Sequence, residues 1–180
     1  SGEYTAAHDI WLPWAHRGDP AAQRNLAHLY RRGLGVSQDF VQAASWYRLA
    51  ADSGLARAQA NLAAMYLRGQ GVAQDAKEAA FWFTSAATNG HALAQYNLAL
   101  LYLRGEGVER SEAKAAGWLY LATKAGYEPA IRALARLVPA ISGPAGPPSP
   151  SSRPPSSSPS SPLASPPASQ QAGKPAKTPT

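Results

Sequence analysis

The chain has 180 residues, including 16 prolines and 15 glycines, with no cysteine and a formal net charge of +6 at pH 7. The lack of cysteine excludes a disulfide framework, a thiolate metal site and a cysteine nucleophile. No run approaches the roughly 20 apolar residues of a membrane-spanning helix, so no membrane span is expected.

Proline and charge divide the chain into two parts. Residues 143–180 hold 12 of the 16 prolines and 10 serines, without an aromatic or acidic residue, and predict a disordered tail with polyproline II character. Residues 1–142 hold 14 basic and 11 acidic residues. A balance this mild does not predict nucleic-acid binding, for which basic side chains would gather on one face. Because the chain opens at Ser1, we expect a processed form or a fragment whose targeting segment is already gone.

The expected helical part begins with a partial repeat over residues 1–18. Its helix should cover residues 4–16, with Trp11 and Trp14 as its aromatic residues. Pro13 is expected to kink or weaken this helix, because it lacks the backbone N–H that a helix interior requires.

Three full units of 36 residues follow, over residues 19–54, 55–90 and 91–126. Identical residues recur in the same phase of all three units, which predicts a tandem repeat array. The recurring residues are Asn25, Asn61, Asn97; Leu26, Leu62, Leu98; Tyr30, Tyr66, Tyr102; Gly33, Gly69, Gly105; Gly35, Gly71, Gly107; Trp46, Trp82, Trp118; and Gly54, Gly90, Gly126.

Each unit is predicted to form two helices. The first ends at an Arg-Gly pair, because glycine adopts the left-handed conformation at a helix C-terminus. The second begins at Asp39, Asp75 or Ser111 as N-cap, and Gln42 and Glu78 are predicted to complete capping boxes. Helical spacing with alanine places Trp46, Trp82 and Trp118 in the core. Residues 127–142 repeat the first-helix pattern and are expected to cap the stack.

Two motifs carry a family resemblance. A-x-x-N-L-A-x-x-Y-x-R-G-x-G-V, followed by D-x-x-x-A-A-x-W-x-x-x-A-A-x-x-G, resembles the Sel-one-like repeat (SLR) family, which is related to the tetratricopeptide repeat. The resemblance implies an all-α, right-handed α-solenoid of antiparallel helix pairs. It also implies a scaffold for protein complexes, often in the periplasm or elsewhere in the bacterial envelope, with the cytoplasm as the alternative. The penicillin binding of a cysteine-rich branch does not carry over to a chain without cysteine.

No pattern of catalytic residues is found in the sequence. The repeated G-x-G turns each follow a helix, whereas a dinucleotide-binding loop follows a strand, so they are interpreted as helix stops. The four histidines have no partner at metal-ligand spacing, and no nucleophile, base and orienting group come together. We therefore expect no catalytic residue, no cofactor, no metal site and no enzyme activity.

Periodic polar residues on the first helices are the candidate binding surface. Each Asn precedes an Arg by seven residues, which places both on one helix face, and the resemblance places first helices along a concave groove. The asparagines are interpreted either as braces between neighbouring units or as ligands for a peptide backbone. The arginines either neutralise helix C-termini or bind acidic groups of a partner. The candidate groove residues are Asn25, Asn61, Asn97, Arg32, Arg68, Arg104, Arg24, His28, Arg31, Arg57, Tyr96 and Leu100.

The functional hypothesis is a non-catalytic protein-interaction scaffold or adaptor that binds a protein or peptide partner in this groove, where the arginines would suit acidic groups. One alternative is a periplasmic regulator that holds a sensor or envelope protein inactive. A more distant alternative, from another class, is an envelope hydrolase or β-lactam-binding enzyme. The sequence does not determine an oligomeric state.

Overall fold

The protein is described by a computed structural model in which residues 2–142 are placed, with side chains up to residue 138. All of them belong to one compact unit, and the predicted disordered tail, 143–180, lies outside the described residues. Residues 2–142 form eight helices and no strand, as the all-α prediction requires. The helices are α1 (Gly2–His16), α2 (Pro20–Arg32), α3 (Phe40–Asp52), α4 (Ala56–Arg68), α5 (Ala76–Thr88), α6 (Ala92–Arg104), α7 (Glu112–Lys124) and α8 (Glu128–Ser142).

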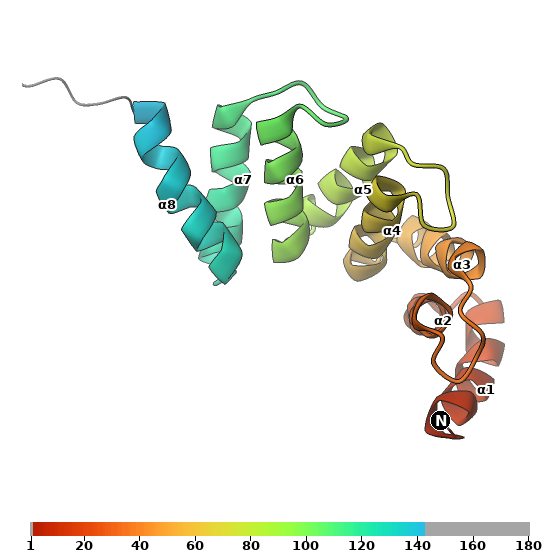
Figure 1. Ribbon diagram of the computed structural model, residues 1–180. Coiled ribbons are helices and arrows are strands. Elements are labelled where there is room, and N and C mark those ends of the chain that lie inside the picture. Colours follow the sequence, from red (N-terminus) through yellow and green to blue (C-terminus); the bar gives the residue numbers. More distant parts are fainter. Residues whose placement is uncertain (1, 143–180) are drawn as a thin grey trace, which may run out of the picture. The chain divides into compact units, whose positions relative to one another are not determined.

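The helices stack in chain order as antiparallel neighbours, so the unit is an α-solenoid (Figure 1). The pairs α2·α3, α4·α5 and α6·α7 share the most extensive contacts, and each pair joins the next through a less extensive contact. This is the arrangement of a repeat protein, in which a unit contacts only its neighbours in the stack. The N-terminal helix α1 continues through Pro13 to His16.

Aspartate caps start two of the second helices, as predicted. Asp39 Oδ1 accepts hydrogen bonds from the N–H groups of Val41 and Gln42, both at 2.9 Å. The predicted capping boxes are not formed, however. The N–H of Asp39 donates to the carbonyl of Tyr30 instead, because the chain returns across the end of the first helix. In the second unit Asp75 likewise donates to Tyr66.

The two glycines of each G-x-G turn have different tasks. Gly69 lies at φ +64 and ends α4, with its N–H donating to the carbonyl of Met65. Gly71 lies at φ +71 against the N-terminus of α3 in the preceding unit, where a Cβ would overlap the Phe40 carbonyl and lie 2.7 Å from the Val41 nitrogen. The second glycine is therefore required for close packing between units as well as for its backbone conformation.

The buried aromatic position on the second helices differs from the one predicted. Trp82 is buried, but Trp46 and Trp118 are only half-buried and pack at the edge of the core. The position one residue later is fully buried in all three units and carries Tyr47, Phe83 and Leu119. The tryptophan prediction was thus right for one unit of three. Helix packing shifted the centre of the buried stripe by one residue.

Glutamine side chains, rather than asparagine, join neighbouring units. Gln23, Gln59 and Gln95 are buried, and each Nε2 donates to a carbonyl eight residues earlier, on the last turn of the preceding helix, at 3.1 Å. Asn97 instead donates to Leu93 within its own helix. The interpretation of the asparagines as braces is therefore wrong. Glutamine occupies that role because its side chain lies on the buried face, two residues earlier.

Candidate functional site

A pocket crosses three consecutive first helices. It has a volume of about 320 Å³, and its walls come from α2, α4 and α6, with one side chain from α5. Its lining residues are Arg31, Ala60, Asn61, Ala64, Met65, Leu67, Arg68, Phe83, Leu93 and Asn97. We call this the first-helix pocket. Four candidate groove residues lie in it: Arg31, Asn61, Arg68 and Asn97.

The pocket exists because the middle unit carries small side chains at two positions of its first helix. Ala60 occupies the position that holds Arg24 in the first unit and Tyr96 in the third. Ala64 occupies the position that holds His28 in the first unit and Leu100 in the third. Alanine between larger neighbours leaves an empty space over α4. Its floor is apolar, formed by the buried Met65 and Phe83.

The first helices are the basic face of the array. Together α2, α4 and α6 contain no acidic residue. They contain the arginines Arg24, Arg31, Arg32, Arg57, Arg68 and Arg104. Only Arg104 has an ion-pair partner within residues 2–142, namely Glu106 at 3.7 Å. The charges of the other arginines are left uncompensated, although the charge of the whole helical part is mild.

Arginine charges lie close to two histidines, His28 and His91. Burial lowers the pKa of His28 below its ordinary value, and the charges of Arg31, Arg32 and Arg24 lower it further. Burial also lowers the pKa of His91, with a contribution from Arg57. Both histidines therefore favour their neutral forms. His91 also serves as the N-cap of α6, where its Nδ1 accepts a hydrogen bond from the Ala94 N–H at 3.3 Å.

Arg31 lines the pocket with a partly buried side chain. Its Nε is buried and has no hydrogen-bond partner among the described residues. Tyr47 lies beneath it, and burial raises the pKa of the Tyr47 hydroxyl, while the neighbouring Arg31 charge partly offsets that rise. Arg31 therefore lies against the buried Tyr47 and also lines the pocket, where its charge can attract an anionic group.

The remaining candidate residues do not line the pocket. Tyr96 packs against Tyr127, the residue just before α8, with ring centroids 5.4 Å apart. The others are at most half-buried and lie on the same first helices: Asn25, Arg24, His28 and Arg32 on α2, Arg57 on α4, and Leu100 and Arg104 on α6.

Six lining residues were missed by sequence reasoning, and the repeat itself held the signal for four of them. Ala60 and Ala64 share repeat positions with candidate residues. Leu67 shares the position of Arg31, and Leu93 that of Arg57. These four residues were not predicted as lining residues because alanine and leucine are typical of core positions. Met65 and Phe83 are core side chains that only packing exposes to the pocket.

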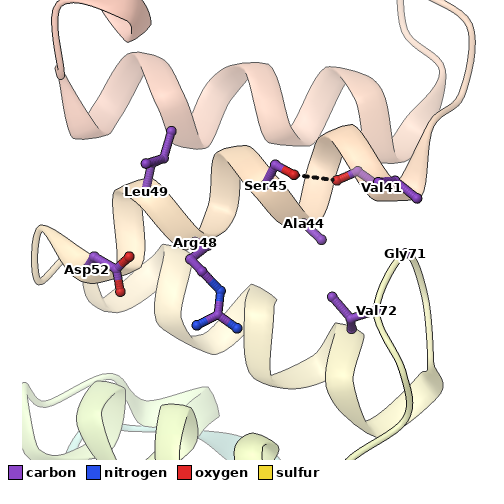
Figure 2. A pocket seen from close by; sticks show the side chains of 8 residues that line it. All are labelled: Val41, Ala44, Ser45, Arg48, Leu49, Asp52, Gly71 and Val72. Carbon is purple, nitrogen blue, oxygen red and sulfur yellow. Dashed lines mark hydrogen bonds between the residues drawn. The ribbon is translucent and has the colours of Figure 1, made fainter.

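A second pocket, of about 370 Å³, lies between α3 and the turn that carries Gly71 and Val72 (Figure 2). Two of its polar side chains, those of Ser45 and Arg48, are already engaged. The Ser45 hydroxyl donates to the Val41 carbonyl at 3.0 Å. Arg48 points from α3 toward α4, donates to the Tyr66 hydroxyl and lies 5.5 Å above the rings of Tyr66 and Trp82. These contacts stabilise the junction between units, and Asp52 is the lining polar side chain that they leave unengaged.

Residues 2–142 show neither a membrane span nor a metal-binding cluster. None of the helices there is both long and apolar enough to cross a membrane. Among the same residues, no group of three or more histidine, aspartate or glutamate side chains is placed to hold a metal ion.

Comparison with known proteins identifies the fold and the family. A crystal structure of c5321, a protective antigen of uropathogenic Escherichia coli strains with an SLR fold, superposes with a TM-score of 0.72 at 30% identity. It covers 74% of this chain, which spans only 29% of c5321. A Sel1 repeat protein from Oxalobacter formigenes superposes with a TM-score of 0.66 at 37% identity, over 71% of this chain and 96% of that one. None of the curated proteins matches the chain.

The repeat motif gives the final assignment. The family model of the Sel1 repeat matches residues 20–55, 56–91 and 92–127, each beginning one residue after the units drawn from the sequence. Sel1 repeats are generally protein-interaction scaffolds, and none of the comparisons points to an enzyme family. With three matched repeats in an SLR fold, the chain belongs to the Sel1 repeat family.

Proposed function

We propose that this protein is a non-catalytic interaction scaffold that binds a segment of a protein partner along the first helices, centred on the first-helix pocket. The observation that carries the proposal is the convergence of Arg31, Asn61, Arg68 and Asn97, from three different repeats, around one apolar floor. Concave sites with an apolar base and a few converging polar groups are typical binding sites.

The two asparagines support a peptide ligand. Asn61 is half-buried at the pocket wall, and its side chain forms no hydrogen bond with the described residues. An amide offers both donors and an acceptor, so it can pair with the N–H and C=O groups of an extended backbone. Asn97 uses one amide hydrogen on Leu93, and its second hydrogen and its oxygen remain for a ligand.

A pull-down with the full chain tests this function. Proteins captured from cells of the source organism are compared between the wild type and Arg68→Glu, which reverses one charge at the pocket. Lys77→Glu is the matched control, because Lys77 is an exposed cation on α5 outside the pocket. We expect Arg68→Glu to lose a specific partner that the control retains. Equal capture by both variants, with intact helical circular dichroism, contradicts the proposal.

Location in the bacterial envelope stays a prediction of the family resemblance. Fractionation of source cells, with an antibody against this chain, tests it directly. Recovery with cytoplasmic markers contradicts the envelope prediction and leaves the interaction proposal standing, since the pocket does not depend on the compartment.

A further inference from the structure

Building on the proposed function, we propose that the ligand is an acidic protein segment with one large apolar side chain. The apolar side chain enters the first-helix pocket over Ala60 and Ala64, and the neighbouring carboxylates pair with arginines on α2 and α4. This assigns the chemistry of the partner and predicts which part of it each repeat binds.

The apolar anchor follows from the shape of the pocket. Its volume of about 320 Å³ is at the small end of the range for ligand pockets, which suits one bulky side chain better than a cofactor. The floor is formed by Met65 and Phe83, and the wall toward α6 by Leu93, which is 43% exposed. Covering an exposed leucine and an open apolar floor with an apolar group of the ligand removes apolar surface from water and so favours binding.

The acidic character follows from uncompensated charge. Arg24, Arg31, Arg32, Arg57 and Arg68 make no ion pair within residues 2–142, and their helices carry no acidic residue. Arg31 and Arg68 lie in the pocket wall itself. Carboxylates bind guanidinium groups through two parallel hydrogen bonds, so either arginine can pair with an acidic side chain of the ligand.

Charge also falls along the array, which gives the ligand a direction. The first helix α2 carries three arginines, α4 two, and α6 only Arg104, which is paired with Glu106. In place of charge, α6 presents Leu93 and Leu100. The acidic part of the ligand therefore lies over α2 and α4, and its apolar part over α4 and α6. A nucleic acid, whose charge repeats at every nucleotide, matches this gradient poorly.

Selection from a random peptide library displayed on phage tests the proposal with the full chain as bait. We expect enriched sequences with aspartate or glutamate on one side of a large apolar residue. One enriched peptide is then labelled and its affinity measured by fluorescence anisotropy. Companion peptides replace its acids with amides, or its apolar anchor with alanine, and a single-stranded oligonucleotide serves as the polyanion comparison.

Two variants use side chains that the array already carries at the same repeat position, so that folding is preserved. Ala64→Leu copies Leu100 and fills the pocket. Arg31→Leu copies Leu67 and removes one charge. We expect Ala64→Leu to weaken binding roughly tenfold to a hundredfold, the range for losing a buried apolar anchor, with little effect on the peptide that lacks the anchor. Arg31→Leu should weaken binding about threefold to tenfold, and only for the acidic peptide.

The outcomes separate this inference from the proposed function. Enriched peptides without acids, or affinities that neither variant changes, overturn the acidic, anchored ligand while leaving a peptide-binding scaffold. Tighter binding of the oligonucleotide than of any peptide overturns it in favour of nucleic acid. If the library yields no specific peptide and the pull-down captures no partner, the proposed function fails as well.

Discussion

Substitution of Gly71 by alanine tests how the repeats are held together. Gly71 and Gly54 both have positive φ, at +71 and +85 respectively. A Cβ on Gly54 would meet nothing within 4 Å, whereas a Cβ on Gly71 would overlap the Phe40 carbonyl of the preceding unit. The two glycines therefore share a backbone requirement and differ in packing. Gly54→Ala is the matched control for Gly71→Ala.

The expected cost is worked from these two terms. A left-handed backbone costs an alanine roughly 1–2 kcal/mol, and this term applies to both variants. Forcing an extra carbon into a closely packed junction adds about 1–3 kcal/mol, and only Gly71→Ala carries this term. We expect its free energy of unfolding to fall by about 2–5 kcal/mol, against about 1–2 kcal/mol for Gly54→Ala.

Urea unfolding followed by far-UV circular dichroism measures both values. Because each unit contacts only its neighbours, parting the first two repeats should also broaden the transition of Gly71→Ala and lower its m-value. Gly107→Ala repeats the test at the next junction, where a Cβ would overlap the Ala76 carbonyl. Equal destabilisation by Gly54→Ala and Gly71→Ala would refute the argument that close approach between units requires the second glycine.

Three further predictions concern side chains. Gln59→Ala should lower the free energy of unfolding by about 1–3 kcal/mol, since it removes a buried hydrogen bond between units. Asn61→Ala should change that free energy by less than about 0.5 kcal/mol. A larger loss for Asn61→Ala than for Gln59→Ala in urea unfolding would show that asparagine, not glutamine, joins the units. Arg48→Gln should cost about 1 kcal/mol through lost contacts with two aromatic rings, and an unchanged unfolding midpoint would contradict this. The pKa values of His28 and His91 lie below the ordinary 6.5, so the unfolded chain takes up protons first as pH falls through 6.5, and the folded state loses stability. The double variant His28→Asn, His91→Asn should therefore show a melting temperature that changes less than that of the wild type between pH 7.5 and 5. An identical pH dependence in both proteins would refute the lowered pKa values of these histidines.

Helix boundaries and caps could be predicted because their causes are local. Gly69 ends a helix through its own left-handed backbone, and Asp39 starts one through bonds to N–H groups two and three residues away. The prediction of capping boxes was wrong, and the reason is a contact that cannot be read from neighbouring residues. The N–H of Asp39 donates a hydrogen bond to the carbonyl of Tyr30, nine residues earlier, because the chain folds back there.

The candidate site was predicted by position more accurately than by residue. Arg31 and Arg68 were chosen for their charge, and both lie in the pocket wall. Ala60 and Ala64 were passed over, although their counterparts in other repeats were chosen. A pocket depends on what is missing between side chains, and a small residue has no distinctive signal until its larger neighbours are placed around it.

The sequence and the tertiary structure determine different features of this protein. By itself the sequence determined the period of 36 residues, the helix ends and the all-α class, since these depend on side chains and backbone preferences within a few turns. Only the tertiary structure decided that Tyr47 and Phe83 centre the core, that Gln59 joins the units, and that Ala60 and Ala64 leave a pocket over α4. Those features depend on which helix faces meet, and stacking brings together residues that the sequence holds 36 positions apart.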